Sequence, residues 1–532
     1  MKLNIKKSRL EIHKNTKQKA LEYLSYLSDE LIEYQKGVEH YKEREFSISN
    51  KDDLFEAISK SKLIFLGDFH TFDQSSKNLE RILKTFFEPN NDIILGVEFV
   101  HVKNQIYIEN FLSGVITERE FLESINYRES WRFPWTHYKV FFDLAKENNF
   151  KIIGLNTEGP IEKRDYEAAH VINKILSKKP NQKFFVLFGE LHILPNRLPK
   201  ITKEIAKINY QHVIVHQNIE DIYWRIYDRD DSLASKSLII KFDKNEYSLQ
   251  NSPPWIKYES MIYWYENLCD DPEFDLHEYI IETGMKSFDG NIYENFYFLC
   301  KKLNETLELN LCDEELEDFN IFDHQSLENI LWRIQESALR DEDKDFYEVL
   351  IHKGELFHLP CTNTYYCPSY SINRISILAG FHVFSLIQNK ASPPTNLKNL
   401  LTYYCFAHYV GYFSSKIFNP FRKCDLYLDL IKKSQKHEKK MWRIISLKIL
   451  RGESCDEEIS NASIEEVFHI GKQIGNLIAD LSFYSQSDKN YFFDIIINLS
   501  IERRFDFSLL KKIIFELTSQ TPNFYQKTKT LL

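Results

Sequence analysis

The sequence predicts an α/β fold, a mainly parallel β-sheet flanked by helices, followed by a mostly α-helical C-terminal domain. Between residues 62 and 217, short apolar runs alternate with segments of helical spacing. Strands that are apolar throughout and alternate with helices are typical of a parallel sheet buried on both faces. The 532 residues include only 15 Gly and 15 Pro, about half the usual share, which favours long regular elements over many turns.

Five apolar runs are the predicted parallel strands: residues 62–67, 92–98, 151–156, 183–189 and 212–217. The segments between them show the periodicity of helices. They cover residues 75–87, 118–125, 137–148 and 162–176. The second of these begins at a capping box formed by Thr117 and Glu120, a signature of a helix N-terminus.

The chain on either side of these units is predicted as follows. Residues 16–45 have the spacing of one long helix, and a short helix follows at 52–58. After the last parallel strand, tighter spacing predicts antiparallel strands at residues 222–227, 237–242 and 246–250. Pro253 and Pro254 then interrupt the chain. We therefore expect an N-terminal helical segment (1–55), an α/β domain (56–252) and a mostly helical domain of unknown role (253–532).

Composition limits the classes of partner. The formal net charge is −10, which argues against a nucleic-acid-binding protein with a basic face. No uninterrupted run of about 18 apolar residues predicts a membrane span, and the N-terminal residues do not read as a signal peptide. The eight Cys are scattered through the second half, which fits a reduced compartment. We expect a cytoplasmic protein that binds a small molecule, with its oligomeric state left open.

Four glycines lie within or at the ends of successive predicted strands, at Gly67, Gly96, Gly154 and Gly189. In an open α/β sheet, ligands bind beyond the carboxyl ends of the strands. His70 and His192 each follow such a glycine in a Gly-x-x-His motif, and Glu98 follows another. Because parallel strands end at the same edge, we expect these three side chains to converge there, with Asp68 and Glu190 beside them.

Two kinds of chemistry fit such a group. Imidazole and carboxylate are ligands for a divalent metal such as Zn²⁺, Mn²⁺ or Co²⁺, which His70, Glu98 and His192 would hold. The same residues could act as general bases without a metal. A single Gly-x-x-His motif occurs often by chance, whereas two motifs at matching strand ends favour a real site.

Two further sets of residues are candidates for the site, and each also has a purely structural interpretation. Arg164 and Asp165 follow the third strand; they could bind an anion or orient a base, or form a solvated helix N-terminus. Tyr138 could supply an oxygen ligand to haem iron, although packing in the core is the commoner role of such a residue.

With these residues in view, the segment 55–220 resembles the ChaN-like haem-binding uptake family. It also resembles the wider superfamily of Tiki metalloproteases, TraB proteins and erythromycin esterases. Paired Gly-x-x-His motifs with an acidic residue between them mark that superfamily. Further features of the ChaN-like pattern are Gln105, the segment 111–124, Trp135 with Tyr138, the segment 145–156, and Arg164 with Asp165.

This resemblance implies a ChaN-like or erythromycin-esterase-like α/β fold. It also implies haem or a divalent metal bound at the His/Glu site, with Asp68, Glu190 and Tyr138 as cofactor-binding candidates. The alternative it implies is a hydrolase, esterase-like or peptidase-like. Its catalytic residues would be His70, Glu98, His192, Arg164 and Asp165, acting with a metal or through a histidine base.

Overall fold

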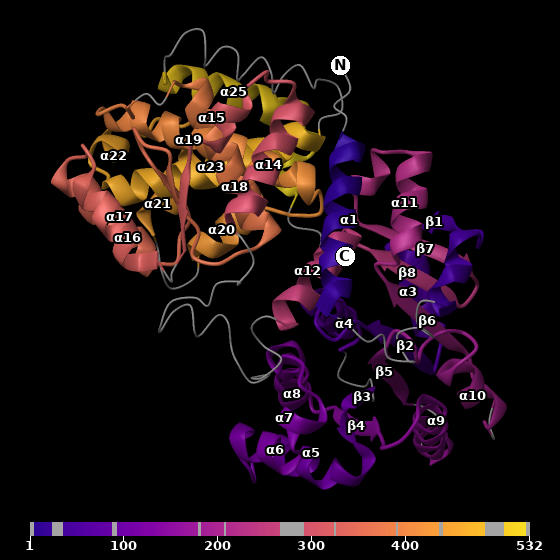
Figure 1. Ribbon diagram of the computed structural model, residues 1–532. Helices are drawn as coiled ribbons and strands as arrows, with labels where there is room; N and C mark the ends of the chain where they lie inside the picture. Colours follow the sequence, from indigo (N-terminus) through magenta and orange to yellow (C-terminus); the bar gives the residue numbers. More distant parts are fainter. Residues whose placement is uncertain are drawn as a thin grey trace. The chain divides into compact units, whose positions relative to one another are not determined.

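The computed structural model divides into two units (Figure 1). It describes residues 5–23, 36–87, 93–178, 182–206, 209–265, 292–323, 326–389, 392–435, 440–484 and 505–527. The α/β unit comprises His13–Asp275, and the helical unit comprises Leu276–Thr530 together with Met1–Ile12. One division falls within the first helix, α1 (Ile5–Tyr23), and the other after Asp275.

The α/β unit is built on an eight-stranded sheet of order β1-β7-β8-β6-β2-β5-β3-β4. Strands β8, β6, β2, β5, β3 and β4 are parallel to one another, while β7 is antiparallel to both β8 and β1. Their bounds are β1 (Ser47–Ser49), β2 (Leu63–Asp68), β3 (Ile93–His101), β4 (Lys151–Asn156), β5 (Lys183–Gly189), β6 (His212–Gln217), β7 (Leu238–Asp243) and β8 (Glu246–Gln250). The predicted α/β class and its five parallel strands are confirmed.

Helices cover both faces of this sheet (Figure 1). One face packs against α3 (Lys51–Lys60), α4 (Asp73–Phe86), α5 (Gln105–Leu112), α6 (Glu118–Ser124), α7 (Tyr127–Ser130) and α8 (Thr136–Asn148). The other packs against α9 (Ile161–Lys178), α10 (Leu198–Glu204) and α11 (Glu220–Arg229). Successive residues of a strand point to opposite faces, so β6 gives Val213 and Val215 to one core and Ile214 to the other. This explains why the parallel strands are apolar throughout.

The capping box at the start of α6 is confirmed, since the Thr117 and Glu120 side chains each bond the other's backbone N–H. The short 3₁₀ helices of this unit are η1 (His40–Lys42), η2 (Val102–Asn104) and η3 (Leu233–Ser235), and the helix after β8 is α12 (Pro254–Tyr263). The predicted helix 16–45 is described as far as Tyr23 by α1, whereas residues 24–35 lie outside the described part.

The predicted strand at 222–227 is wrong, because these residues belong to the helix α11. Its buried residues are Ile222, Tyr223, Ile226 and Tyr227, which recur at intervals of three and four and so share one face of a helix. A six-residue apolar run fits a strand or a helix equally well, and periodicity alone cannot separate them.

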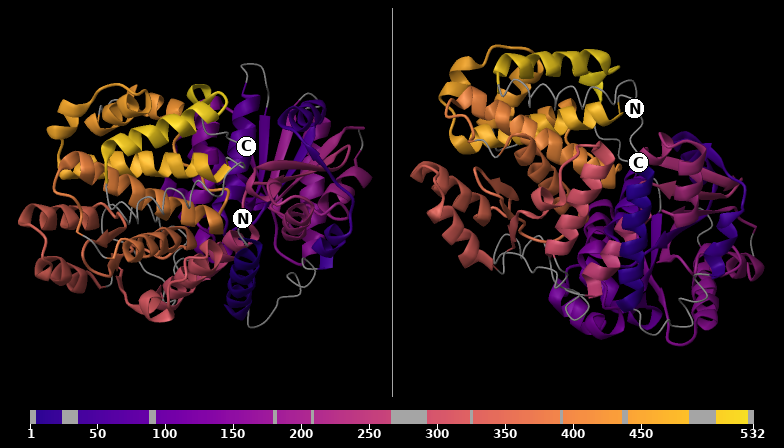
Figure 2. Two further views of the ribbon diagram at one scale, coloured as in Figure 1. Left: turned by 90° about the horizontal axis from the view of Figure 1, so that it is seen from above. Right: turned by 45° about the horizontal axis from the view of Figure 1, so that its top comes forward.

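The helical unit has a core of long buried helices, with α19 packed against both α18 and α23. In Figure 2 these helices, drawn in orange to yellow, lie side by side. The helices are α14 (Ile292–Leu307), α15 (Asp313–Glu317), α16 (Leu327–Glu336), α17 (Asp341–His352), α18 (Ile372–Ile387), α19 (Leu397–Phe418), α20 (Tyr427–Gln435), α21 (Met441–Leu450), α22 (Asp456–Ser460), α23 (Ile464–Tyr484), α25 (Phe507–Gln520) and η6 (Phe524–Gln526). A small sheet joins β10 (Phe357–Leu359), β11 (Thr364–Tyr366) and β9 (Asn320–Phe322).

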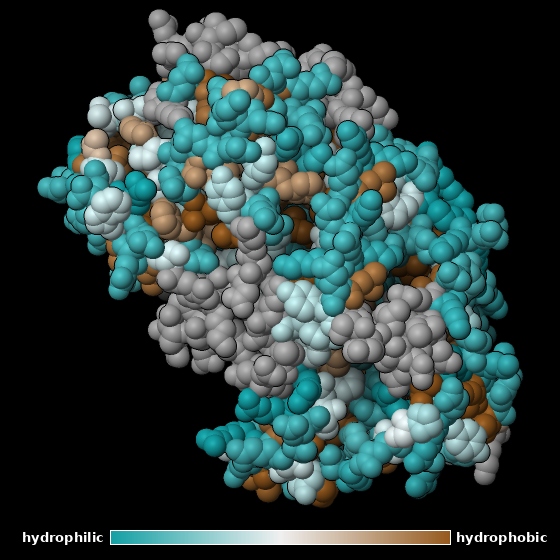
Figure 3. All heavy atoms as spheres, viewed as in Figure 1, coloured by the Kyte–Doolittle hydropathy of each residue, from teal (hydrophilic) through white to brown (hydrophobic). Residues whose placement is uncertain are grey.

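Among the described residues, no helix has the length and apolar character needed to cross a membrane. On the face drawn in Figure 3, most of the coloured side chains are hydrophilic, and the hydrophobic ones form small separate groups.

Candidate functional site

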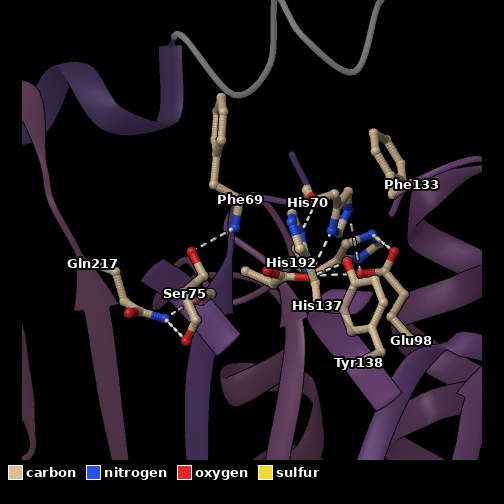
Figure 4. Close-up of polar contacts among 12 residues, drawn as sticks. Phe69, His70, Ser75, Glu98, Phe133, His137, Tyr138, His192 and Gln217 are labelled. Atoms are coloured by element: carbon tan, nitrogen blue, oxygen red, sulfur yellow. Dashed lines mark hydrogen bonds and ion pairs between the residues drawn. The ribbon is translucent and has the colours of Figure 1, made fainter. Parts of the chain in front are cut away.

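The two Gly-x-x-His motifs meet because their strands are neighbours in register. Asp68, the last residue of β2, pairs with Gly189, the last residue of β5. Strand β3 lies on the other side of β5, with Val97 opposite Leu187, and brings Glu98 to the same edge. In Figure 4 the side chains of His70, His192 and Glu98 converge above these strand ends. The convergence expected from the sequence is therefore present.

His70 is held by a chain of buried hydrogen bonds. Its Nδ1 donates to Asp68 Oδ2 at 2.9 Å, and the Tyr138 hydroxyl donates to the same oxygen at 2.8 Å. The His70 ring lies against Trp131 and Phe133, with centroids 4.6 and 4.8 Å away. Burial by itself lowers the pKa of His70, but the charge and hydrogen bond of Asp68, with Glu98, outweigh it and raise the pKa. The second nitrogen, Nε2, lies 3.9 Å from Glu98 Oε2.

Glu98 is the central anion of the site. It accepts the Gly189 backbone N–H on Oε2 at 2.6 Å, and the Arg164 guanidinium and His192 both lie on Oε1. Burial alone raises the pKa of Glu98, but the opposing charges of His192, His70 and Arg164 hold that pKa far below its ordinary value. Glu98 is therefore ionised at neutral pH.

His192 lies between two carboxylates. Its Nδ1 donates to Asp165 Oδ1 at 2.5 Å, and its Nε2 lies 3.3 Å from Glu98 Oε1. Burial lowers the pKa of His192, but Glu98 and Asp165 outweigh burial and raise the pKa to about 9. His192 is thus an imidazolium that neutralises Glu98, together with Arg164.

A cavity of about 820 Å³ opens above these groups. Its floor is polar and includes Asp68, His70, Glu98, Arg164 and His192. Its walls carry aromatic rings from three segments of the chain: Phe69, Trp131, Phe133, Trp264 and Tyr265. No pattern in the sequence groups these rings, because they come from loops and from the end of α12.

The remaining candidates have other places. Tyr138 is fully buried beneath Asp68 and does not line the cavity. Glu190 lines the cavity, but both its oxygens accept from Lys257 Nζ, at 2.8 and 2.7 Å. Lys257 is not among the residues predicted for the site, because the sequence after Pro253–Pro254 predicts a separate helical domain.

The described part of the chain holds no group of three or more His, Cys, Asp or Glu arranged to bind a metal ion. Nδ1 of His70 donates a hydrogen bond to Asp68, and Nδ1 of His192 donates one to Asp165. The Glu98 oxygens are occupied by Gly189, Arg164 and His192.

Residues 54–164 match the model of a family described as haem-binding uptake, Tiki superfamily, ChaN. Over these residues the α/β unit resembles the ChaN family. The matched segment contains His70, Glu98, Tyr138 and Arg164, whereas His192 lies beyond it. Among solved structures, a ChaN from Campylobacter jejuni described by its cofacial haem binding aligns at 14% identity and a TM-score of 0.25, covering 32% of this chain and 86% of that chain. A search of the curated proteins finds no match.

Proposed function

We propose that the ChaN-like α/β unit binds haem in the cavity above the strand ends. One observation carries this proposal: an imidazole, His70, packs against two aromatic rings, Trp131 and Phe133, on the wall of a cavity of about 820 Å³. That volume lies within the range of small-molecule sites. The description of the matched family as haem-binding supports the same ligand.

The residues present fit what haem requires, which is an axial nitrogen or oxygen and apolar surroundings for the ring. His70 would supply the axial nitrogen through Nε2, because Nδ1 is already committed to Asp68. Such a carboxylate partner fixes the tautomer and orientation of a ligating imidazole. Trp131, Phe133 and Trp264 would contact the macrocycle. Bound haem would supply an iron centre, and Tyr138 would act on it only through Asp68.

The test is a titration of the full chain with haem, followed by visible absorption. We expect a shifted Soret band at stoichiometric haem for the wild type, and its loss or displacement in His70→Ala. His101→Ala is the matched control, since His101 lines the same cavity, and it should leave the spectrum unchanged. Tyr138→Phe should also keep the wild-type spectrum. A wild type without a haem spectrum, or a His70→Ala variant with the wild-type spectrum, would contradict the proposal.

A second candidate is hydrolysis with His70 as the base, favoured by the Tyr138–Asp68–His70 chain of hydrogen bonds. A carboxylate on Nδ1 leaves Nε2 as the acceptor, as a general base requires. His70 Nε2 would take a proton from water, and the hydroxide would attack a carbonyl carbon. The leaving group would depart with the proton from the imidazolium. Hydrolysis of p-nitrophenyl acetate that falls in His70→Ala and Asp68→Asn, but not in His101→Ala, would support this candidate, and no wild-type hydrolysis above background would rule it out.

A further inference from the structure

A second cavity, of about 470 Å³, lies beside the first in the α/β unit. Three side chains line both cavities, namely Phe69, Glu190 and Met261, and we call them the partition. Figure 4 shows Phe69 pointing away from the strand ends, between Gln217 of the second cavity and His70 of the first. The two cavities therefore adjoin each other along these three side chains.

Lys257 stands on the second-cavity side of the partition. The residue is 7% exposed, and its Nζ donates to both oxygens of Glu190 and lies 4.5 Å from the centroid of the Phe69 ring. An ammonium group carries three N–H donors. Glu190 takes two, and no hydrogen-bond partner for the third occurs in the described part of the α/β unit. A buried cation with an unused donor thus lines the second cavity.

The same helix, α12, lines both cavities. Lys257 lines the second cavity, and Met261 lines both cavities. Trp264, just after the end of α12, lines the first cavity. Trp264 follows Lys257 by seven positions, which corresponds to about 10 Å along a helix. A ligand with an aromatic body beside Trp264 would therefore reach Lys257 with a group about 10 Å away.

We propose that the second cavity receives a carboxylate group of the ligand whose apolar body fills the first, and that Lys257 binds this carboxylate. The ligand class is an amphipathic aromatic carboxylate, of which a tetrapyrrole with acidic side chains is one member. This inference rests on the proposed function and adds the recognition of the ligand's acidic end.

The other charges of the second cavity place the carboxylate at the partition. Glu220 is already paired with Lys17 and His13 and accepts from Tyr258. Asp221, in the first turn of α11, lines the cavity as a further carboxylate. The cations on that side of the cavity, Lys17 and Lys42, are paired with Glu220 and Glu39, whereas Lys257 keeps an unused donor beside Phe69.

The experiment compares protoporphyrin IX with its dimethyl ester, titrated into the full chain and followed by fluorescence. The wild type should bind the free acid more tightly than the ester. Lys257→Met should lose about tenfold to a hundredfold in affinity for the acid, as expected for one hydrogen bond to a charged group, and little for the ester. Glu190→Gln should bind the acid more tightly, because the amide no longer neutralises Lys257. Lys42→Met is the control, since exposed Lys42 lines the same cavity and should have no such effect.

A second variant guards against misfolding, because Lys257→Met leaves Glu190 without its cation. The double variant Glu190→Gln/Lys257→Met removes both charges and should show equal affinity for acid and ester. Equal wild-type affinities for the two, no binding of either, or a Lys257→Met loss that is the same for both would overturn the inference. The porphyrin contains no iron, so these outcomes are separate from the haem titration of the His70 variants.

Discussion

At the scale of single residues, the site is organised around one buried carboxylate. Glu98 is 3% exposed, yet two imidazoles, a guanidinium and a backbone N–H surround it. A buried charge is tolerated only when it is paired and hydrogen-bonded. Removing one partner of such a pair destabilises a protein by about 3–5 kcal/mol, since the other charge is left uncompensated. Loss of the Glu98 carboxylate should therefore destabilise the α/β unit.

The protonation of His192 makes this stabilisation depend on pH. The pKa of His192 is raised to about 9, above the value of about 6.5 expected for an unfolded chain. A raised pKa contributes stability that is complete below about pH 6.5 and is lost as the pH rises towards 9. In Glu98→Gln the imidazolium loses a counter-charge, so the pKa of His192 should fall.

We therefore expect Glu98→Gln to lower the free energy of unfolding of the α/β unit by about 3 kcal/mol at pH 6, with a smaller deficit at pH 9. Urea titrations followed by tryptophan fluorescence at pH 6, 7.5 and 9 measure this. Glu158→Gln is the matched control, because exposed Glu158 lines the same cavity and should change stability by less than about 1 kcal/mol. Parallel pH profiles for wild type and Glu98→Gln would contradict the assignment of His192 as the titrating group.

The sequence could locate His70, Glu98 and His192 because each follows a glycine at a predicted strand end. It could not locate Lys257, since nothing in a single sequence says that a helix after a Pro–Pro break folds back over the strand ends. It also left the role of Tyr138 open. Only the packing of α8 against the sheet brings the Tyr138 hydroxyl to within 2.8 Å of Asp68.

At the scale of elements, the close approach of three strands explains the glycine that ends β5. A Cβ atom on Gly189 would lie 3.2 Å from both Glu98 Oε2 and His70 Nε2. Contacts this short force the neighbouring side chains to move. The strand end must therefore lack a side chain for the imidazole and the carboxylate to share the space above it.

Gly189→Ala should displace His70 and Glu98 and so weaken haem binding, while costing about 1–3 kcal/mol through overpacking. Gly96→Ala is the comparison, because its Cβ would meet Leu155 and Phe184 in the core rather than the site. It should lower stability and keep the haem affinity of the folded protein. The measurement pairs urea unfolding with haem titration for each variant. A Gly189→Ala variant with unchanged haem affinity would show that the imidazole needs no open strand end.

Elements with a strong pattern could be predicted, and short or polar ones could not. The strands that are apolar on both faces stand out because two cores bury them. Strand β1 spans only Ser47–Ser49 and is mostly exposed, so it has no apolar signal and forms through its pairing with β7. The aromatic and β-branched residues of α11 favour a strand in the sequence, and packing of its buried face against the sheet selects the helix instead.

At the scale of the whole molecule, the Pro253–Pro254 pair marks the start of a helix. Proline suits the first turn of a helix, where its missing N–H costs nothing. Helix α12 begins at Pro254 and belongs to the α/β unit, to whose cavities it contributes Lys257 and Met261. The Pro–Pro pair in the sequence indicates a break between elements. It does not indicate whether the helix that follows packs on the α/β unit or on the helical unit.

Because each unit has its own core, we expect perturbations of one to leave the other intact. In the helical unit, Lys416 is fully buried and pairs with Asp480 at 2.8 Å. Lys416→Met leaves that carboxylate without its cation and should destabilise the helical unit by about 3–5 kcal/mol. Haem should instead stabilise the α/β unit, by about 2.7 kcal/mol at a hundredfold excess over its Kd. Calorimetry of the full chain should show two unfolding transitions. Lys416→Met should lower the temperature of one, and haem should raise the temperature of the other. Lys512→Met is the control: it removes an exposed ion pair and should shift neither transition temperature. A single transition that moves as a whole with both changes would mean that the two cores unfold as one.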